Sequence, residues 1–227
     1  RKGRIFKIGE GFYRMITLQE NTTILYFGTY NPVHVGHMII GQFIYENSNA
    51  KELWYVVSPQ NPFKKNQTIL DDRQRLHMVN LAINDPYHIK TSDIEFNLPK
   101  PSYTAVTLAH LSEKYPDKKF AIIMGSDNLV NFHKWKNYEQ ILKNHEIVVY
   151  PRVLTIQELE KIKAGEDISK TSSNIDIQKE NITVLEDTPI MKISSSFIRK
   201  AIKENKSVKY LLTPEVEKYC DEMNFYR

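Results

Sequence analysis

Cysteine is almost absent from this chain of 227 residues, in which Cys220 is the only one. A single cysteine excludes a disulfide within the chain, which favours a reducing compartment, so we expect a cytoplasmic protein. No apolar run approaches the ~18 residues that a membrane-spanning helix needs. The basic stretch at residues 1–20 also lacks the continuous apolar segment and small-residue cleavage site of a secretory signal. Composition therefore argues against membrane and secreted classes.

A strong charge of either sign is also missing. The net charge is only +4, from 31 Lys and Arg against 27 Asp and Glu, without a long basic tract. Neither nucleic acid nor a membrane is therefore expected as a partner, whereas a small anionic substrate needs only a local positive site. The length fits one core domain. We expect residues 1–20 to be an extension outside the core, with Met15 as a candidate natural start, and residues 21–227 to form a single domain.

Short β-rich runs alternate with helix-period stretches along the chain. Strands are expected at 23–28, 52–58, 88–95, 119–125, 146–150 and 181–185, and helices at 38–46, 71–84, 103–115, 195–204 and 214–223. The polar stretch 154–181 is expected to be a surface helix with a mobile loop. This alternation predicts an α/β fold, Rossmann-like and doubly wound, with a mainly parallel sheet flanked by helices and a C-terminal helical portion.

Loops rich in Gly, Pro, Ser, Asn or Asp follow the expected strands. They are residues 28–32, 59–62, 125–128, 151–152 and 193–196. Ligands of open parallel sheets bind beyond the carboxyl ends of the strands. We therefore expect these loops to share one rim and to form the site.

The most informative loop is GTYNPVHVGH, residues 28–37. Gly28 allows a tight turn and the close approach of a phosphate, and Gly36 opens a helix whose free amides favour an anion. His34 and His37 lie three residues apart, so both can donate hydrogen bonds to one phosphorylated ligand. Two incidental histidines or a metal pair are the alternatives, but no further metal ligands lie nearby at fitting spacing. The Gly-Thr-x-Asn-Pro lead-in favours phosphate binding.

A second segment, ISSSFIR at residues 193–199, begins another expected helix. Serines at such a position are first of all N-caps. The same helix start also suits a phosphate, and Arg199, about one turn further on, offers a planar fork of donors. Alone the segment is a weak signal, but paired with the histidine loop it becomes a strong one.

Together the two segments resemble the signature pair of the nucleotidyltransferase superfamily, and the chain is similar to the bacterial nicotinate-nucleotide adenylyltransferases. Further matching segments are SPQNPFKK (58–65), RLHMVNLA (75–82), PSYT (101–104) and GSDNL with a downstream Trp (125–135). The resemblance runs from about residue 22 to 226. It departs at Asn31, where the family often has Asp, and at Pro62-Phe63-Lys64-Lys65, where the family often has Pro-Pro-His-Lys.

The resemblance implies a direct in-line displacement. The 5′-phosphate of nicotinate mononucleotide would attack the α-phosphorus of ATP, and pyrophosphate would leave, as a step of NAD biosynthesis. His34, His37 and Arg199 would be catalytic, and Mg²⁺ would arrive with ATP rather than on a metal site of the protein. ATP would contact Gly28, Thr29, Tyr30, Gly36, His37, Asp127, Ser194, Ser195, Ser196 and Arg199.

The acceptor would lie at the other end of the same site. Trp135 would stack on the pyridine ring, although a lone Trp is more often a core residue. Asp127 would accept hydrogen bonds from ribose hydroxyls, unless it is the N-cap of a short helix. Backbone amides of Thr104 and Ala105, and of Trp135 and Lys136, would bind the nicotinate carboxylate. The acceptor set is Lys64, Lys65, Tyr103, Thr104, Ala105, Asp127, Trp135 and Lys136, with either lysine closing over phosphate.

Two alternatives stay open at this stage. The acceptor of an adenylyltransferase on this fold is in some cases nicotinamide mononucleotide or phosphopantetheine, although a pantetheine-type enzyme usually lacks the Trp segment. The other alternative is a non-catalytic nucleotide-binding module, against which the presence of both histidines, the serines and Arg199 argues. The sequence leaves open whether the chain forms a homo-oligomer.

Overall fold

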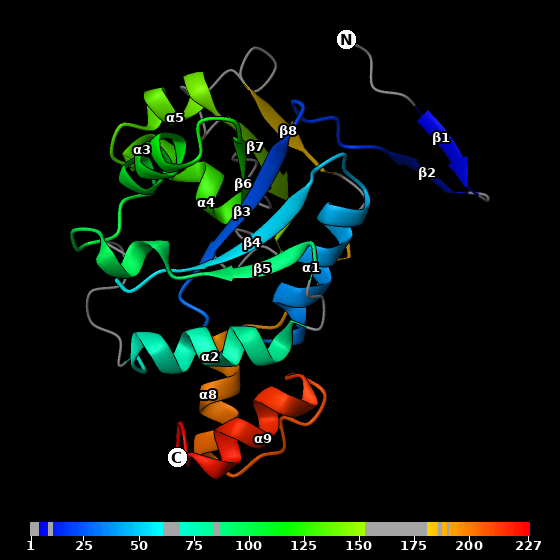
Figure 1. The fold of residues 1–227 in the computed structure, drawn as a ribbon. Coiled ribbons are helices and arrows are strands. Elements are labelled where there is room, and N and C mark those ends of the chain that lie inside the picture. Colours follow the sequence, from blue (N-terminus) through cyan, green and yellow to red (C-terminus); the bar gives the residue numbers. More distant parts are fainter. Residues whose placement is uncertain are drawn as a thin grey trace, which may run out of the picture.

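A sheet of parallel strands forms the centre of the protein (Figure 1). The computed structural model describes residues 5–8, 11–60, 69–83, 87–152, 181–185, 188–189 and 191–227. Within them the strands of this sheet are β3 (Thr22–Gly28), β4 (Glu52–Val57), β5 (Ile89–Ser92), β6 (Lys119–Gly125), β7 (Glu146–Tyr150) and β8 (Ile182–Val184). Their spatial order is β5-β4-β3-β6-β7-β8, and each neighbouring pair is parallel.

The strand order indicates at which edge of the sheet a ligand would bind. The chain builds outward from β3 to β4 and β5, then crosses to the other side of β3 to add β6, β7 and β8. Open α/β sheets bind ligands at such a reversal, outside the carboxyl ends of the strands. The site is therefore expected where β3 ends at Gly28 and β6 ends at Gly125.

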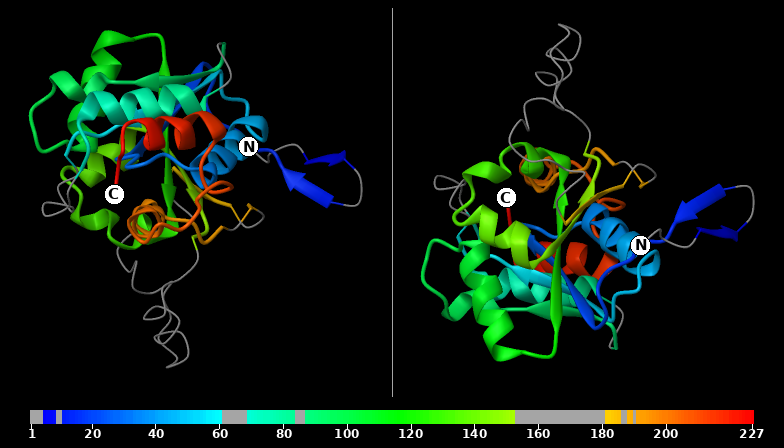
Figure 2. Two further views of the ribbon diagram at one scale, coloured as in Figure 1. Left: turned by 90° about the horizontal axis from the view of Figure 1, so that it is seen from below. Right: turned by 90° about the horizontal axis from the view of Figure 1, so that it is seen from above.

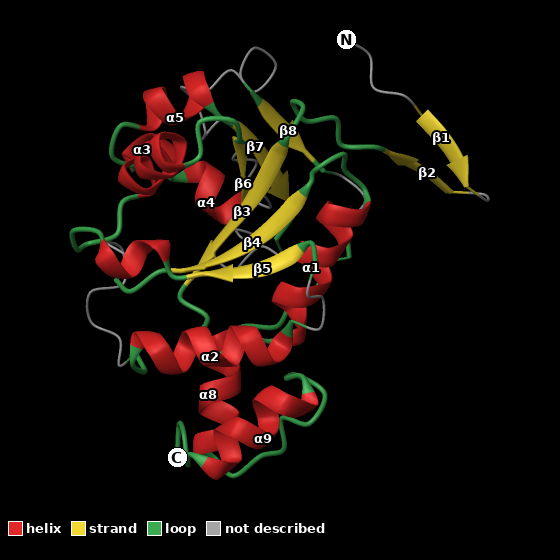
Figure 3. Ribbon diagram, in the orientation of Figure 1, coloured by secondary structure: helices red, strands yellow, loops and turns green. Residues whose placement is uncertain are grey.

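Helices cover both faces of the sheet, which confirms the doubly wound prediction (Figure 3). On one side lie α1 (Val35–Glu46), α2 (Asp72–Ala82), α8 (Ser195–Lys203) and α9 (Pro214–Glu222). On the other lie α3 (Thr104–Lys114), α4 (Ser126–Val130) and α5 (Tyr138–Asn144). Two buried clusters follow this division, one containing Ile44 and Met78 and the other Leu108 and Ile141. Burial on both faces explains why the central strands are almost continuously apolar.

Some predicted boundaries are wrong. α1 begins at Val35 rather than at residue 38, with His34 as its N-cap. The strand expected at 88–95 ends at Ser92, and a short 3-10 helix, η1 (Ile94–Asn97), follows it. That turn carries Glu95 into the interior, where its carboxylate accepts a hydrogen bond from the Thr107 hydroxyl at 2.7 Å. The stretch 154–180 lies outside the described residues.

The N-terminal part contains a hairpin that the sequence did not predict. Strands β1 (Ile5–Ile8) and β2 (Gly11–Arg14) pair with each other and project from the body of the protein (Figure 2). Ile16 and Leu18 belong to residues 1–20, which were expected to lie outside the core, yet both side chains are buried in the hydrophobic core. Among the described residues, no helix is long and apolar enough to cross a bilayer.

Candidate active site

The loop after β3 brings both histidines of the first motif to one place. His34 caps α1, and His37 lies in the first turn of that helix. Their rings stack, with centroids 3.7 Å apart and planes inclined by 28°. The His34 backbone N–H donates to Nδ1 of His37 at 3.2 Å. Because Nδ1 of His37 accepts this bond, a neutral His37 ring carries its proton on Nε2 and is a donor there.

His34 acts as a neutral ring in the physiological pH range. Burial, to which the Arg152 cation adds, lowers the pKa of His34 from 6.5 to about 4. Its Nδ1 is buried and has no hydrogen-bond partner among the described residues. A buried polar atom without a partner is costly. The capping geometry of α1 turns the His34 side chain toward the backbone N–H groups of the first turn of the helix, which suits an unprotonated Nδ1.

The ring of Tyr30 packs against Gly28, which the sequence did not predict. Tyr30 has a positive φ of 48°, and its buried ring lies edge-on to His37 at a centroid distance of 5.1 Å. A Cβ on Gly28 would come within 2.6 Å of the Tyr30 ring. Packing of the Tyr30 ring therefore requires glycine here, and Gly28 also lines the cavity described below.

The second motif packs directly against the first. Ser194 caps α8 by accepting from the Phe197 amide at 3.2 Å, while the Ser195 hydroxyl donates to the Pro32 carbonyl at 2.9 Å. Arg199 donates through Nη1 to the Asn31 carbonyl at 2.7 Å. Residues 168 positions apart in the chain thus meet, as the pairing of the motifs predicted.

Arg152 is a cavity residue that the sequence analysis did not select. Its loop was placed at the rim, but nothing in the sequence fixed the direction of its side chain. Arg152 follows β7 and forms an ion pair with Asp127, with Nη1 and Oδ2 2.8 Å apart. The N-cap of α4 is Gly125, so the alternative interpretation of Asp127, as the N-cap of a short helix, is wrong. Its Oδ1 is buried, has no hydrogen-bond partner among the described residues, and lies so close to Gly125 that a Cβ there would come within 2.4 Å of it.

These residues surround one cavity of about 360 Å³ at the carboxyl ends of β3 and β6. It reaches from the α8 serines and Arg199, past the histidines, to Trp135. Predicted residues in its lining are Gly28, Thr29, Tyr30, His34, His37, Asp127, Trp135, Ser194, Ser195, Ser196 and Arg199. Among the described residues that line it, the charged groups are the guanidinium groups of Arg152 and Arg199 and the carboxylate of Asp127, so this lining suits an anion.

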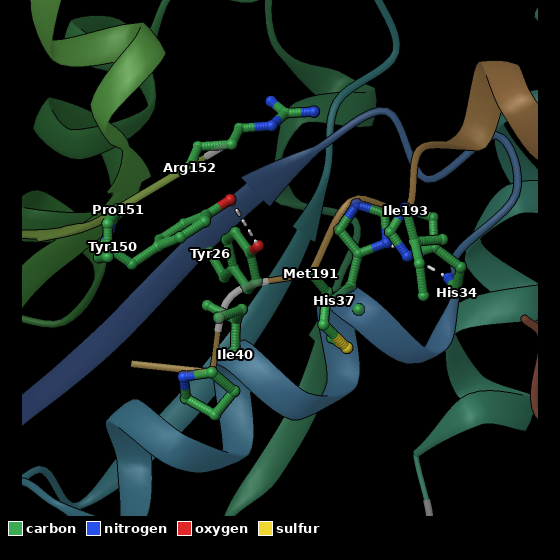
Figure 4. A pocket seen from close by; sticks show the side chains of 11 residues that line it. Tyr26, His34, His37, Ile40, Tyr150, Pro151, Arg152, Met191 and Ile193 are labelled. Atoms are coloured by element: carbon green, nitrogen blue, oxygen red, sulfur yellow. Dashed lines mark hydrogen bonds between the residues drawn. The ribbon is translucent and has the colours of Figure 1, made fainter. Parts of the chain in front are cut away.

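A smaller cavity of about 70 Å³ adjoins the first (Figure 4). The two share Tyr26, His34, His37, Tyr150 and Arg152, and Gly36 lines only the smaller one. Figure 4 shows Met191 and Ile193 close to the histidines, and the hydroxyls of Tyr26 and Tyr150 joined across the middle at 3.1 Å. The smaller cavity therefore extends from the histidines along a partly apolar wall.

Part of the predicted acceptor set lies beside the larger cavity rather than in its lining. Tyr103, Thr104, Ala105 and Lys136 are outside that lining. The Lys136 ammonium nevertheless lies 4.8 Å from the centre of the Tyr103 ring, so the Trp135 segment and the start of α3 are neighbours. The two lysines expected to close over phosphate, Lys64 and Lys65, fall outside the described residues.

Buried Arg75 holds two loops of the rim together. Its guanidinium is fully buried and donates to the carbonyls of Thr29, Ser58 and, through Nε at 3.0 Å, Leu70. These carbonyls belong to the chain after β3, the end of β4 and the entrance to α2. The sequence matched this segment to the family but gave no sign that a charged side chain would be buried there.

Within the described residues, no group of three or more His, Cys, Asp or Glu side chains is arranged to hold a metal ion. Among the described residues that line the larger cavity, Asp127 is the one with a carboxylate, and it is already paired with Arg152. A divalent cation with its preferred oxygen ligands would need most of them from phosphates and water.

Known proteins resemble this chain in sequence and in fold. A family model described as cytidylyltransferase-like matches residues 25–201. A relative from Flavobacterium johnsoniae, named probable nicotinate-nucleotide adenylyltransferase, is 51% identical over 203 residues, which cover 89% of this chain and 97% of that protein. A relative from Bacteroides thetaiotaomicron with the same name is 36% identical over 209 residues, covering 92% and 95%.

Among solved structures, the nicotinic acid mononucleotide adenylyltransferase of Plasmodium falciparum complexed with NaAD has a TM-score of 0.70 to this chain. The match covers 91% of this chain and 98% of that one at 18% sequence identity. At such low identity the likeness is one of fold, and it agrees with the Rossmann-like prediction.

Proposed function

The chain belongs to the cytidylyltransferase-like family, and on that premise we propose that it transfers AMP from ATP to nicotinate mononucleotide in NAD biosynthesis. The observation that carries the proposal is the continuous cavity that joins the stacked histidines, Arg199 and the α8 serines to Trp135. A phosphate-binding end and an aromatic end in one cavity suit a reaction between a triphosphate and a nucleotide with a planar base.

The chemistry is one displacement at phosphorus. An oxygen of the acceptor 5′-phosphate forms a bond to the α-phosphorus of ATP, and the bond from that phosphorus to the bridging oxygen of the β-phosphate breaks. The products are nicotinate adenine dinucleotide and pyrophosphate. Because both nucleophile and leaving group belong to the substrates, the protein acts by positioning them and by stabilising charge.

The geometry suggests a role for each polar group. His37, with Nδ1 occupied by the His34 amide, presents Nε2–H to an oxygen of the α-phosphate. Neutral His34 donates to a neighbouring phosphate oxygen. Arg199 and the first amides of α8 bind the β- and γ-phosphates, because a helix start favours anions. Arg152 neutralises phosphate charge between the two substrates.

The two ends of the site would separate the two bases. Trp135 stacks on the pyridine ring, and the carboxylate of Asp127 accepts a hydrogen bond from a ribose hydroxyl. The smaller cavity, with Met191 and Ile193, then lies where the adenine of ATP would enter. Mg²⁺ belongs to the substrate in this proposal, bound by the phosphates of ATP, where it offsets their charge. The cytoplasmic location expected from the sequence is part of the proposal.

The direct test is a pyrophosphate-release assay with Mg²⁺ and ATP and, separately, nicotinate mononucleotide, nicotinamide mononucleotide and phosphopantetheine. Nicotinate mononucleotide should give the fastest release, with nicotinate adenine dinucleotide identified by mass. Fastest release with phosphopantetheine would assign another acceptor. No release with any acceptor would favour the non-catalytic binding module.

A lysine at position 199 should not replace the arginine in ATP binding. Lysine keeps the positive charge but cannot donate both to the Asn31 carbonyl and to phosphate oxygens as a planar fork. The KM for ATP should therefore rise about fivefold in the Lys variant, and at least as much in Arg199→Ala. Steady-state kinetics at saturating acceptor measure it. Wild-type ATP kinetics in Arg199→Lys would mean that this residue is only a charge on the helix surface.

A further inference from the structure

A tyrosine near the end of the chain contacts the catalytic loop. The hydroxyl of Tyr226 donates to Oδ1 of Asn31 at 2.8 Å, across 195 positions of sequence. The backbone carbonyl of the same Asn31 accepts from Nη1 of Arg199 at 2.7 Å. One residue of the loop after β3 thus joins Tyr226 to the arginine assigned to the phosphates of ATP.

The backbone around Tyr226 adopts an unusual conformation that directs its ring to this loop. Asn224 has φ 54° and Tyr226 has φ 67°, in the left-handed region that a bulky residue rarely adopts. Between them Phe225 is buried, with its amide bonded to the Cys220 carbonyl at 2.9 Å and its ring against Tyr219. Residues in sparsely populated backbone regions persist where the surroundings hold them, often at functional sites.

The surroundings keep Tyr226 a hydrogen-bond donor. Burial raises the pKa of its hydroxyl well above the ordinary value of 10, so it stays protonated across the physiological range. The nearby cations of Arg199 and Arg75 act in the opposite direction on this pKa but do not offset the effect of burial. Arg75 in turn donates to the carbonyl of Thr29, so the same loop is held on both sides of Tyr30.

We propose that Tyr226 is a positioning residue for ATP, which fixes the Asn31 side chain and, through the Asn31 carbonyl, the guanidinium of Arg199. Tyr226 is not in the lining of either cavity at the site, so it acts through Asn31 rather than on the substrate. The C-terminal helical portion, to which α9 belongs, therefore takes part in building the phosphate end of the site. The inference rests on the proposed function.

The first test removes only the hydroxyl. Tyr226→Phe should raise the KM for ATP about threefold to tenfold, the effect of one net hydrogen bond, with the KM for the acceptor unchanged. Tyr219→Phe is the matched control, because Tyr219 is on α9 and its ring also packs against Phe225. The control should keep wild-type kinetics. Unchanged ATP kinetics in Tyr226→Phe, or an equal change in both variants, would overturn the inference.

The second test is a double-mutant cycle, which separates positioning from general stability. In an Asn31→Ala background the acceptor oxygen is gone, so Tyr226→Phe should change the KM for ATP no further. In Asn31→Asp an acceptor oxygen remains, and Tyr226→Phe should again raise it. If Tyr226→Phe raised the KM for ATP by the same factor in the Asn31→Ala background as in wild type, Tyr226 would not act through Asn31. A lowered melting temperature with a normal KM for ATP would mean that Tyr226 only stabilises the fold.

Calorimetric titration of Mg²⁺ and ATP into each purified protein keeps this inference distinct from the proposed function. If wild type released no pyrophosphate with any acceptor, the proposed function would fail, but the dissociation constant for ATP would still be measurable. Tyr226→Phe should weaken ATP binding by the same threefold to tenfold. Equal dissociation constants for wild type and variant would reject the positioning role whatever the acceptor is.

Discussion

His37→Ala is expected to lower kcat about a hundredfold or more, on the scale of losing one preorganised donor to developing charge. The His34 amide holds Nδ1 of His37 at 3.2 Å, and the stacked His34 ring and the edge of Tyr30 fix its plane. Nε2–H is thus oriented before the reaction begins. Its hydrogen bond should strengthen as negative charge develops on the α-phosphoryl oxygens. The substitution should therefore remove more stabilisation from the transition state than from the ground state.

The variant should fold normally, because His37 lies at the rim. Steady-state kinetics with saturating ATP and acceptor give kcat, and thermal unfolding checks the fold. His110→Ala on α3 is a suitable control, since His110 lies outside both cavities of the site. It should keep wild-type turnover. Near-normal kcat in His37→Ala would remove this histidine from the catalytic machinery.

Much of this arrangement is local in sequence and was therefore predictable. β6 and β7 have the predicted bounds, because strands buried on both faces read as short apolar runs. The parallel order puts their carboxyl ends at one edge, and each motif sits directly after a strand or at a helix start. The meeting of Arg199 with the loop after β3 follows from those two facts.

Other parts depend on contacts between residues distant in sequence. α4 and α5 were missed because they are only five and seven residues long and lack a full amphipathic period. The buried guanidinium of Arg75 is set by carbonyls of three separate segments. The hydrogen bond between Tyr226 and Asn31 spans 195 positions, and no local sequence pattern predicts it.

The second large effect concerns the acceptor. Nicotinate and nicotinamide mononucleotides differ by a carboxylate against a neutral amide. In the site that we propose for the acceptor, backbone N–H groups at the start of α3, which no side chain of the described residues caps, would bind both carboxylate oxygens. An amide would turn an NH₂ toward those donors and leave polar groups unpaired, at about 1–3 kcal/mol each. The helix dipole favours only the charged acceptor. A preference of about tenfold or more in kcat/KM is expected.

Trp135 should contribute to both acceptors alike, because stacking depends on the ring and not on its substituent. Trp135 lines the cavity but also packs against Phe132, with centroids 5.2 Å apart, so Trp135→Ala needs a check of thermal stability. In a folded variant both acceptors should weaken to a similar degree while the KM for ATP stays unchanged. Loss of preference in this variant would place discrimination at Trp135 rather than at α3.

The ratio of kcat/KM for nicotinate and nicotinamide mononucleotides, measured on the wild-type enzyme with saturating ATP and Mg²⁺, tests the central claim most directly. The proposed carboxylate site predicts a ratio of about ten or more in favour of the acid. A ratio near one, with both acceptors used well, would mean that no such site exists in this enzyme.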